Sequence, residues 1–272
     1  MRAMRAFVVS ITKLIVRFFV KHYTKLISLA AFLVLWQLVI TVFGIKEYII
    51  PSPLATFSTL FVPDIAQRYN WLLHIRTTIS EVLISFAVTA AAGVFVALLI
   101  TWSKALRRVI TPVLTLLNSL PKIAFAPLFL IWFGYGLVPN VIIAVLIAFF
   151  PVIINTATGL NAVEEDLLDL VHYLHASKLQ VFLKIRIPNS LPYIFSGFKI
   201  STTLCVVGAI VGEFVASARG LGYLLKDAQA MIDSAPMFAS LILISAFGLS
   251  LFGVISILER VAMPWQVRGE ES

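Results

Sequence analysis

Charge and cysteine are both scarce in this 272-residue sequence. Asp, Glu, Lys and Arg make up only 12% of the residues, while 60% are hydrophobic and the mean hydropathy is +1.00. A soluble globular domain carries about twice that share of charge, so we expect an integral membrane protein. The single cysteine, Cys205, excludes an intrachain disulfide, and its apolar surroundings indicate a packing role.

Several motifs of catalysis and nucleotide binding are absent as well. No Gly-x-x-x-x-Gly-Lys-Ser/Thr loop occurs, so we expect this chain to bind no nucleotide cofactor in that way. There is no Gly-x-Ser-x-Gly motif, and a lone cysteine cannot support dithiol chemistry. Asp169, His172 and His175 are spaced like ligands on one helix face, but the zinc protease motif His-Glu-x-x-His is missing, and we expect no metal site.

Six apolar segments approach or exceed the roughly 20 residues that cross a bilayer. The predicted spans are 26–45, 77–102, 109–134, 138–158, 191–215 and 237–258. The sequence therefore predicts an all-α polytopic membrane protein with about six transmembrane helices. An even number of spans places both termini on the same side of the membrane.

The basic residues predict which side that is. Most of those outside the spans fall in the N-terminal segment, the 103–108 loop, the 163–190 loop and the C-terminal tail. The remaining loops hold only Lys46, Arg68, Arg76, Arg219 and Lys226. The positive-inside rule then places both termini and the 163–190 loop in the cytoplasm. This topology also accounts for the net charge of +8 without a nucleic-acid partner.

Three regions follow from this topology. Residues 1–25 intersperse apolar runs with Lys13, Arg17 and Lys21, which predicts an amphipathic segment at the lipid interface and not a signal peptide. Residues 26–260 form the transmembrane domain, and residues 261–272 form a cytoplasmic tail.

One water-facing segment interrupts the apolar spans between residues 163 and 192. Its charged residues are Glu164, Glu165, Asp166, Asp169, Lys178, Lys184 and Arg186. Apolar residues recur between them at helical spacing: first Leu167, Leu170, Val171 and Leu174, then Leu179, Phe182 and Ile185. We predict a helix, a turn and a second helix that ends at Pro188. Short amphipathic helices are marginal alone, so the apolar stripe requires a covering surface.

This segment resembles the cytoplasmic "EAA" loop of bacterial ATP-binding-cassette (ABC) importer permeases. The Glu of that motif falls on Asp169, its two alanines on Leu170 and Val171, and its glycine on His175. Its closing Ile-x-Leu-Pro falls on Ile185, Arg186, Ile187 and Pro188. In the family this loop forms coupling helices that dock on a separate ATPase. The resemblance therefore implies a coupling surface made of Asp169, Leu170, Val171, Leu174, His175, Phe182, Ile185 and Pro188.

Other stretches resemble the permeases of the sulfonate, taurine and nitrate type. These are YIIPSPLATFSTL after the first span, NSLPKIAFAPLFLIWFGYG at 118–136 and GLGYLL at 220–225. Pro121 and Pro127 interrupt the third span. Transporters contain interrupted helices of this kind where a helix borders the substrate path and not lipid. Prolines that only kink a packed helix are the alternative interpretation.

The resemblance implies a complete transport mechanism. The chain would be the permease subunit of an ATP-driven importer for a small anion such as a sulfonate, taurine or nitrate. Its partners would be a cytoplasmic ATPase dimer that binds ATP and Mg²⁺, a periplasmic or lipid-anchored substrate-binding protein, and a second permease copy in a homodimer. A neutral vitamin precursor such as a pyrimidine is the alternative substrate. A membrane-embedded enzyme or an assembly protein of the inner membrane is a more distant alternative.

Ionisable residues within the spans are few, and each is a functional candidate because charge is costly in hydrocarbon. We place Lys122, with Pro121, Pro127 and Glu213, on the substrate path. Glu81 and Glu213 are expected to pair with a Lys or Arg or to line the outer mouth. Lys199 is expected to snorkel to the cytoplasmic surface. His22 and His74, at span ends, are expected to be interfacial.

Small residues recur in the fifth predicted span. Gly208 and Gly212 form a Gly-x-x-x-Gly pattern, which lets two helices approach closely in lipid. We predict a helix contact at this pair, either within the chain or across a dimer axis.

Overall fold

The computed structural model describes residue 23 and residues 27–267 of the chain. The predicted amphipathic segment 1–25 and His22 therefore lie outside the described residues, apart from residue 23. The described residues form no β-strand; they form the helix Ile27–Phe43 followed by α2 Pro53–Phe61, α3 Pro63–Tyr69, α4 Trp71–Trp102, α5 Lys104–Ser119, η1 Lys122–Phe125, α6 Ala126–Phe133, α7 Leu137–Asn161, α8 Glu165–Tyr173, α9 Lys178–Val181, η2 Phe182–Arg186, α10 Ile187–Ala216, α11 Leu221–Ala230, α12 Ser234–Ala262 and α13 Pro264–Val267. The all-α prediction is confirmed.

Local sequence signals fix several helix starts. Ser52 caps α2 by accepting a hydrogen bond from the Ala55 N–H at 3.1 Å, and Pro53 occupies the first turn, where its missing N–H costs nothing. Ser103 caps α5 in the same manner through the Leu106 N–H. Between α6 and α7 the chain turns at Gly134 and Gly136, whose φ angles of 72° and 127° favour glycine.

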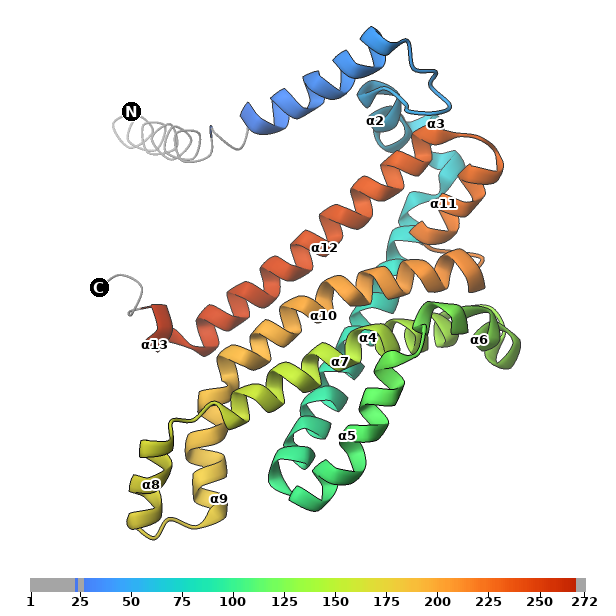
Figure 1. The fold of residues 1–272 in the computed structure, drawn as a ribbon. Helices are drawn as coiled ribbons and strands as arrows, with labels where there is room; N and C mark the ends of the chain where they lie inside the picture. The colour runs from blue at the N-terminus through green and yellow to red at the C-terminus, as the bar shows by residue number, and fades with distance from the viewer. Residues whose placement is uncertain (1–22, 24–26, 268–272) are drawn as a thin grey trace, which may run out of the picture.

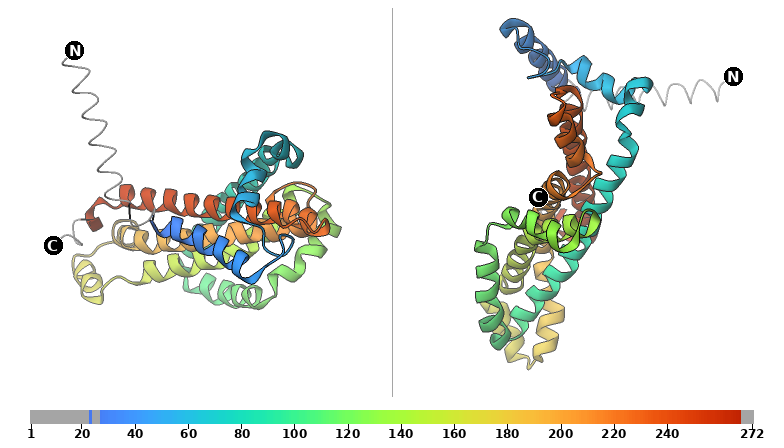
Figure 2. Two further views of the ribbon diagram at one scale, coloured as in Figure 1. Left: turned by 90° about the horizontal axis from the view of Figure 1, so that it is seen from above. Right: turned by 90° about the vertical axis from the view of Figure 1, so that its right-hand side faces the viewer.

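The long helices α7, α10 and α12 run side by side, and α4 crosses them (Figure 1). Helix α10 packs along α7 for most of its length, and α4 packs on α7 from another direction. The short helices α8 and α9 lie at one end of this bundle, which we call the hairpin end. Helices α6 and α11 lie at the other end, which we call the opposite end. The further views show that the bundle is elongated along these helices (Figure 2).

The predicted spans correspond to helices of three kinds. Four helical segments are long and apolar enough to cross a membrane by themselves: Trp71–Trp102, Leu137–Asn161, Ser234–Ala262 and the continuous Lys178–Ala216. The predicted third span is a bent pair, in which Lys104–Ser119 and Lys122–Phe133 meet at 80°. The predicted first span corresponds to the helix Ile27–Phe43, which is shorter than the roughly 20 residues needed to cross a bilayer. The described residues thus hold four or five spans by length and composition.

The Gly208 and Gly212 contact lies within the chain. A Cβ on Gly208 would meet the Cα of Ala144 in α7, and a Cβ on Gly212 would lie 2.8 Å from the Cα of Asn140, also in α7. Both positions lack room for any side chain, so α10 and α7 approach backbone to backbone. The helix that faces Gly208 and Gly212 in this structure is α7 of the same chain.

Much of the apolar surface faces outward. Helix α12 exposes Leu249, Val254 and Ile257, and only 11% of its most apolar stretch is buried. The helix Ile27–Phe43 touches it through Trp36, whose ring stacks on Phe238 at 5.8 Å. Outward apolar side chains of this kind are what a lipid-embedded bundle requires.

Candidate functional site

The hairpin end has the helix, turn and helix that the sequence predicts. Helix α8 begins with Glu165 and Asp166 in its first turn, where their negative charge complements the helix dipole. The chain reverses at His175, which adopts a left-handed conformation with φ of 57°. Ser177 then starts α9 with a capping box, in which its hydroxyl accepts from the Gln180 N–H and the Gln180 side chain accepts from the Ser177 N–H.

The apolar stripe of α8 is not covered by the rest of the chain. Leu167 is 41% exposed, Leu170 55% and Leu174 67%. Leu179 in α9 is also exposed, whereas Val171, Phe182 and Ile185 are half-buried against neighbouring side chains. This arrangement leaves an uncovered apolar edge on a segment that also carries several charges.

Pro188 does not end the second helix, contrary to the sequence prediction. The helix continues from Lys178 to Ala216, with a π-helical turn over Phe182–Arg186 immediately before the proline. The Ile187 N–H bonds to the carbonyl of Phe182, five residues back. A proline ring would clash with the carbonyl four residues earlier, and the wider turn relieves that clash. The hairpin is therefore continuous with the long helix α10.

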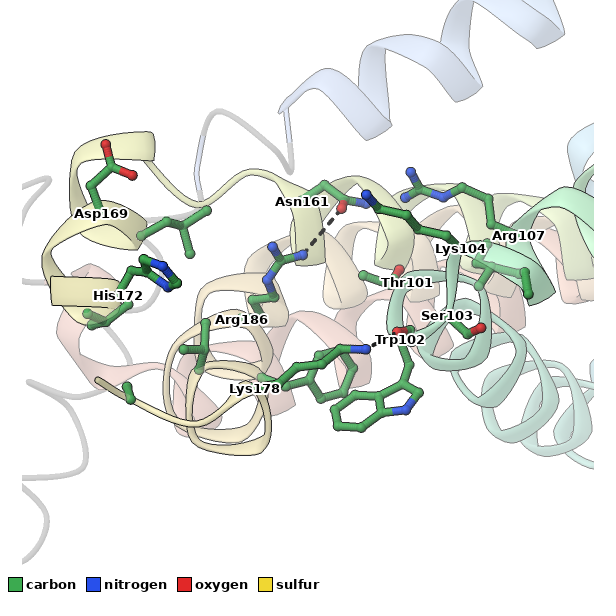
Figure 3. A pocket seen from close by; sticks show the side chains of 17 residues that line it. Thr101, Trp102, Ser103, Lys104, Arg107, Asn161, Asp169, His172, Lys178 and Arg186 are labelled. Carbon is green, nitrogen blue, oxygen red and sulfur yellow. Dashed lines mark hydrogen bonds between the residues drawn. The ribbon is translucent and has the colours of Figure 1, made fainter. Parts of the chain in front are cut away.

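A cavity of about 990 Å³ separates the hairpin from the junction of α4 and α5. Figure 3 shows Lys178 reaching to Trp102 and Arg186 reaching to Asn161. The Lys178 ammonium donates to the Trp102 carbonyl at 2.8 Å and lies 4.5 Å from the centre of the Trp102 ring. Phe182 packs edge-on against the same ring at 5.0 Å. Trp102 is thus a central contact of the hairpin that sequence reasoning did not identify.

The other walls of this cavity carry ionisable side chains. Lys104 and Arg107 come from α5, and Asp169 and His172 come from α8. Among the described residues, no group of three or more His, Cys, Asp and Glu side chains is arranged to hold a metal ion.

The predicted path residues separate in the structure. Pro121 lies in the break at the 80° bend, and Pro127 lies beyond it, in the first turn of α6. The Lys122 ammonium donates to the Asn118 side chain at 2.8 Å, one turn earlier. Glu213 lies elsewhere, fully buried in α10 beneath the 217–222 loop.

Glu81 and Glu213 have no cationic partner, contrary to one of the two expectations for them. Their carboxyl groups belong to one buried cluster, and the described residues place no Lys or Arg side chain in an ion pair with either. Glu81 does line a cavity of about 510 Å³ at the opposite end, together with Arg76 and Arg219. The cluster is completed by Thr78 of the same helix as Glu81, by Asn140 of α7 and by Gly222 of α11.

Two further residues have partners that the sequence did not indicate. His74 is buried and not interfacial as expected, because its ring stacks on Tyr223 and its Nδ1 accepts from the Gly220 N–H at 2.9 Å. Lys199, which we expected to snorkel, forms an ion pair with Glu259 of α12. In both cases the partner comes from a distant segment, so spacing along the chain gave no signal.

The short helices at the opposite end are also fixed by polar contacts. The Tyr69 hydroxyl of α3 donates to the Asp233 carboxylate, at the start of α12, at 2.8 Å. Partial burial, then the bond to this negative charge, raises the pKa of Tyr69 to about 12. The Ser234 hydroxyl donates to the carbonyl of Tyr48, which holds the first loop on the same helix.

Comparison with known proteins extends these observations. Residues 89–262 match the family model described as binding-protein-dependent transport system inner membrane component. The formylaminopyrimidine transport permease protein ThiX of Halalkalibacterium halodurans is 30% identical, over 86% of this chain and 92% of that protein. The putative aliphatic sulfonates transport permease protein SsuC of Bacillus subtilis is 27% identical, over 87% of this chain and 85% of that protein.

A solved structure supports the fold. The inward-facing MetNI methionine ABC transporter superposes with a TM-score of 0.62, at 18% identity, over 71% of this chain and 96% of that chain. The family match covers the core helices α7 and α10, the α8–α9 hairpin between them and the Glu213 loop. The chain therefore belongs to the inner membrane components of binding-protein-dependent transport systems, and it is a permease of an ABC importer.

Proposed function

We propose that the α8–α9 hairpin is the surface on which an ATPase docks and through which ATP hydrolysis drives transport. The single observation that carries this proposal is the uncovered apolar edge of Leu170, Leu174 and Leu179 on an otherwise charged hairpin. An exposed apolar patch rimmed by charge is typical of a protein interface. Membership of an ABC importer family supplies a partner of the right kind.

The hairpin is well placed to transmit force. It connects α7 to α10 directly, and the helix from Lys178 to Ala216 is continuous. Lys178 and Phe182 also hold it against Trp102 at the end of α4. A displacement of the hairpin would therefore move three of the long helices together.

The orientation and assembly follow from this role. We propose that the hairpin end and both termini face the cytoplasm, where a partner ATPase dimer binds ATP and Mg²⁺. The opposite end then faces outward, toward a substrate-binding protein that is periplasmic or lipid-anchored. Two copies of the chain form the permease, as a homodimer. The excess of basic residues in the N-terminal segment, the 103–108 and 163–190 loops and the C-terminal tail supports this orientation.

For the substrate we propose a small organic or inorganic anion such as a sulfonate, taurine or nitrate. The outward cavity is lined by Arg76 and Arg219, and guanidinium groups bind oxyanions with paired hydrogen bonds. The relative named as a sulfonate permease supports the same class. The bend at Pro121, Lys122 and Pro127 continues the path, and Glu213 positions the loop beside its mouth.

A neutral pyrimidine is the second candidate. The observation that favours it is the 30% identity to a permease named for formylaminopyrimidine, which is higher than the identity to the sulfonate permease. Uptake by the complete importer, measured with taurine, nitrate and formylaminopyrimidine as competitors, separates the two. Arg76→Gln should weaken uptake of an anion severalfold, while Lys226→Gln, an exposed cation that does not line the cavity, should not.

Docking is tested by copurification and stimulated ATP hydrolysis. Asp169→Ala and His175→Pro should weaken ATPase binding or uncouple hydrolysis from transport, with the membrane fold intact. Asp64→Ala, an exposed carboxylate on α3 at the opposite end, is the matched control. Transport and ATPase stimulation at the control level in both hairpin variants would refute the docking role.

A further inference from the structure

Two buried carboxyl groups meet where α4 and α10 face each other. Glu81 is 1% exposed and Glu213 is 0% exposed. Thr78, one turn before Glu81 on α4, donates to Glu213, and Asn140, whose Cα would lie 2.8 Å from a Cβ on Gly212, donates to Glu81, so both carboxyls belong to one small buried cluster. Two negative charges in such a cluster, with no ion pair to a Lys or Arg among the described residues, repel each other strongly in a low-dielectric interior. The geometry therefore demands a proton.

Hydrogen-bond donors around Glu213 show that it is the acceptor of that proton. Its Oε1 accepts from the Thr78 hydroxyl at 2.5 Å, and its Oε2 accepts from the Gly222 N–H at 2.6 Å. Thr78 has a single proton to donate, and its oxygen already accepts from the Leu221 N–H at 2.9 Å. Both oxygens of Glu213 thus receive hydrogen bonds, as an ionised carboxylate requires.

Glu81 has the complementary pattern. Its Oε1 accepts from the Asn140 side-chain amide at 2.9 Å. Its Oε2 is buried and receives no hydrogen bond from any donor among the described residues. A hydroxyl at this oxygen would satisfy it as a donor to Glu213 and would remove the repulsion at the same time. We infer that Glu81 and Glu213 form a proton-binding site, in which one proton resides on Glu81 and is donated to Glu213.

The site has a route to water and defined charged neighbours. Glu81 forms part of the wall of the 510 Å³ cavity, which Arg76, Tyr135 and Arg219 also line. His74 lies one turn of α4 before Thr78, and its ring accepts from the Gly220 N–H. The charged neighbours of His74 are Arg219 of the 217–222 loop and Asp227 of α11. Helix α7, which contains no charged residue, contributes the neutral side chain of Asn140 to the pair. The arginines border the cavity and do not neutralise the pair.

The bound proton holds three helices together. Glu213 anchors the loop that begins α11 through the Gly222 N–H, and a Cβ on Gly222 would lie 2.9 Å from the Glu213 Cβ. Thr78 of α4 joins the same loop to Glu213. Removal of the proton would set two negative charges against each other at this junction and separate α4 from α10 and α11. On the proposed orientation this junction closes the outward end, but the site itself does not depend on that orientation.

Infrared spectroscopy of the full-length chain in lipid vesicles tests the site. At neutral pH the wild type should show the C=O stretching band of a protonated carboxylic acid, and strongly alkaline buffer should remove it. Glu81→Gln should lack the band, while Glu165→Gln, which alters an exposed carboxylate of α8, should retain it. Absence of the band from the wild type, or its persistence in Glu81→Gln, would overturn the inference.

Thermal unfolding gives a second measurement that distinguishes the two carboxyls. Glu81→Gln should unfold close to the wild-type temperature, because its amide N–H can donate to Glu213 and its oxygen can accept from Asn140. Glu213→Gln should unfold at a clearly lower temperature, because one amide oxygen cannot replace two acceptor oxygens facing Thr78 and Gly222. Equal losses in both variants would contradict the assignment of the proton to Glu81.

Discussion

The ammonium group of Lys199 in α10 forms an ion pair with the carboxylate of Glu259 in α12. Both side chains are largely but not completely buried, with 26% and 21% exposed. The Lys199 ammonium also lies 6.0 Å from the centre of the Phe252 ring, which belongs to α12 as Glu259 does. The pair is therefore a specific link between α10 and α12, two helices that otherwise meet mainly through apolar side chains.

Lys199→Met should destabilise the chain, because it leaves Glu259 partly buried without a counter-charge. We expect a loss of about 1 kcal/mol, between the small contribution of an exposed pair and the larger loss for a fully buried one. The measurement is the thermal unfolding temperature in detergent. The charge-reversed double variant, Lys199→Glu with Glu259→Lys, should recover part of that loss. Additive losses in the double variant would show that the pair contributes nothing specific.

The close approach of α10 to α7 gives a second prediction. Gly208→Ala should destabilise the chain by about 1–3 kcal/mol, because its Cβ would collide with the backbone of Ala144 and the helices would have to separate. Gly253→Ala is the matched control on α12, where nothing lies within 4 Å of the new Cβ. Since Ala favours a helix over Gly, the control should be neutral or slightly stabilising. Unfolding temperatures check both, and equal effects would refute the packing argument.

Hydropathy and charge were sufficient to predict the general organisation. The run of charges from Glu164 to Arg186 interrupts the apolar spans, and the spacing of Leu167, Leu170 and Leu174 identified α8 as an amphipathic helix. Pro121 lies at the break in the third span, whereas Pro127 lies beyond it, in the first turn of α6. These features depend on neighbours in the sequence, which is why the sequence reveals them.

Features that depend on distant partners were not predictable in this way. The continuation of the helix past Pro188 required the π-helical turn, for which the sequence has no known marker. Glu81 and Glu213 are 132 positions apart, and nothing in either span indicates that the two carboxyls meet. In the sequence, Asn140 is one polar residue near the end of an apolar span, and no neighbouring residue indicates a role for it. Its role follows only from the packing of α7 between α4 and α10.

Tyr69 predicts a pH dependence outside the spans. Its pKa is about 12 in the folded chain, above the usual 10, because burial and then the bond to Asp233 favour the neutral phenol. The neutral form therefore stabilises the α3 contact fully below pH 10, and this contribution is lost as the pH rises through 12. Ultraviolet titration of the tyrosines should lose a transition near pH 12 in Tyr69→Phe. In Asp233→Asn that transition should move toward pH 10, but only partway, since the burial remains.

His175 gives the last prediction, because its left-handed φ of 57° is unfavourable for a residue with a side chain. His175→Gly should relieve about 1 kcal/mol of strain and raise the hydrogen-exchange protection of the α8 and α9 amides about fivefold. His175→Val should lower the same protection, because a β-branched residue fits this conformation worst. Helix α11, far from the turn, is the internal control. Equal protection in the Gly and Val variants would mean that the turn is not constrained as the structure indicates.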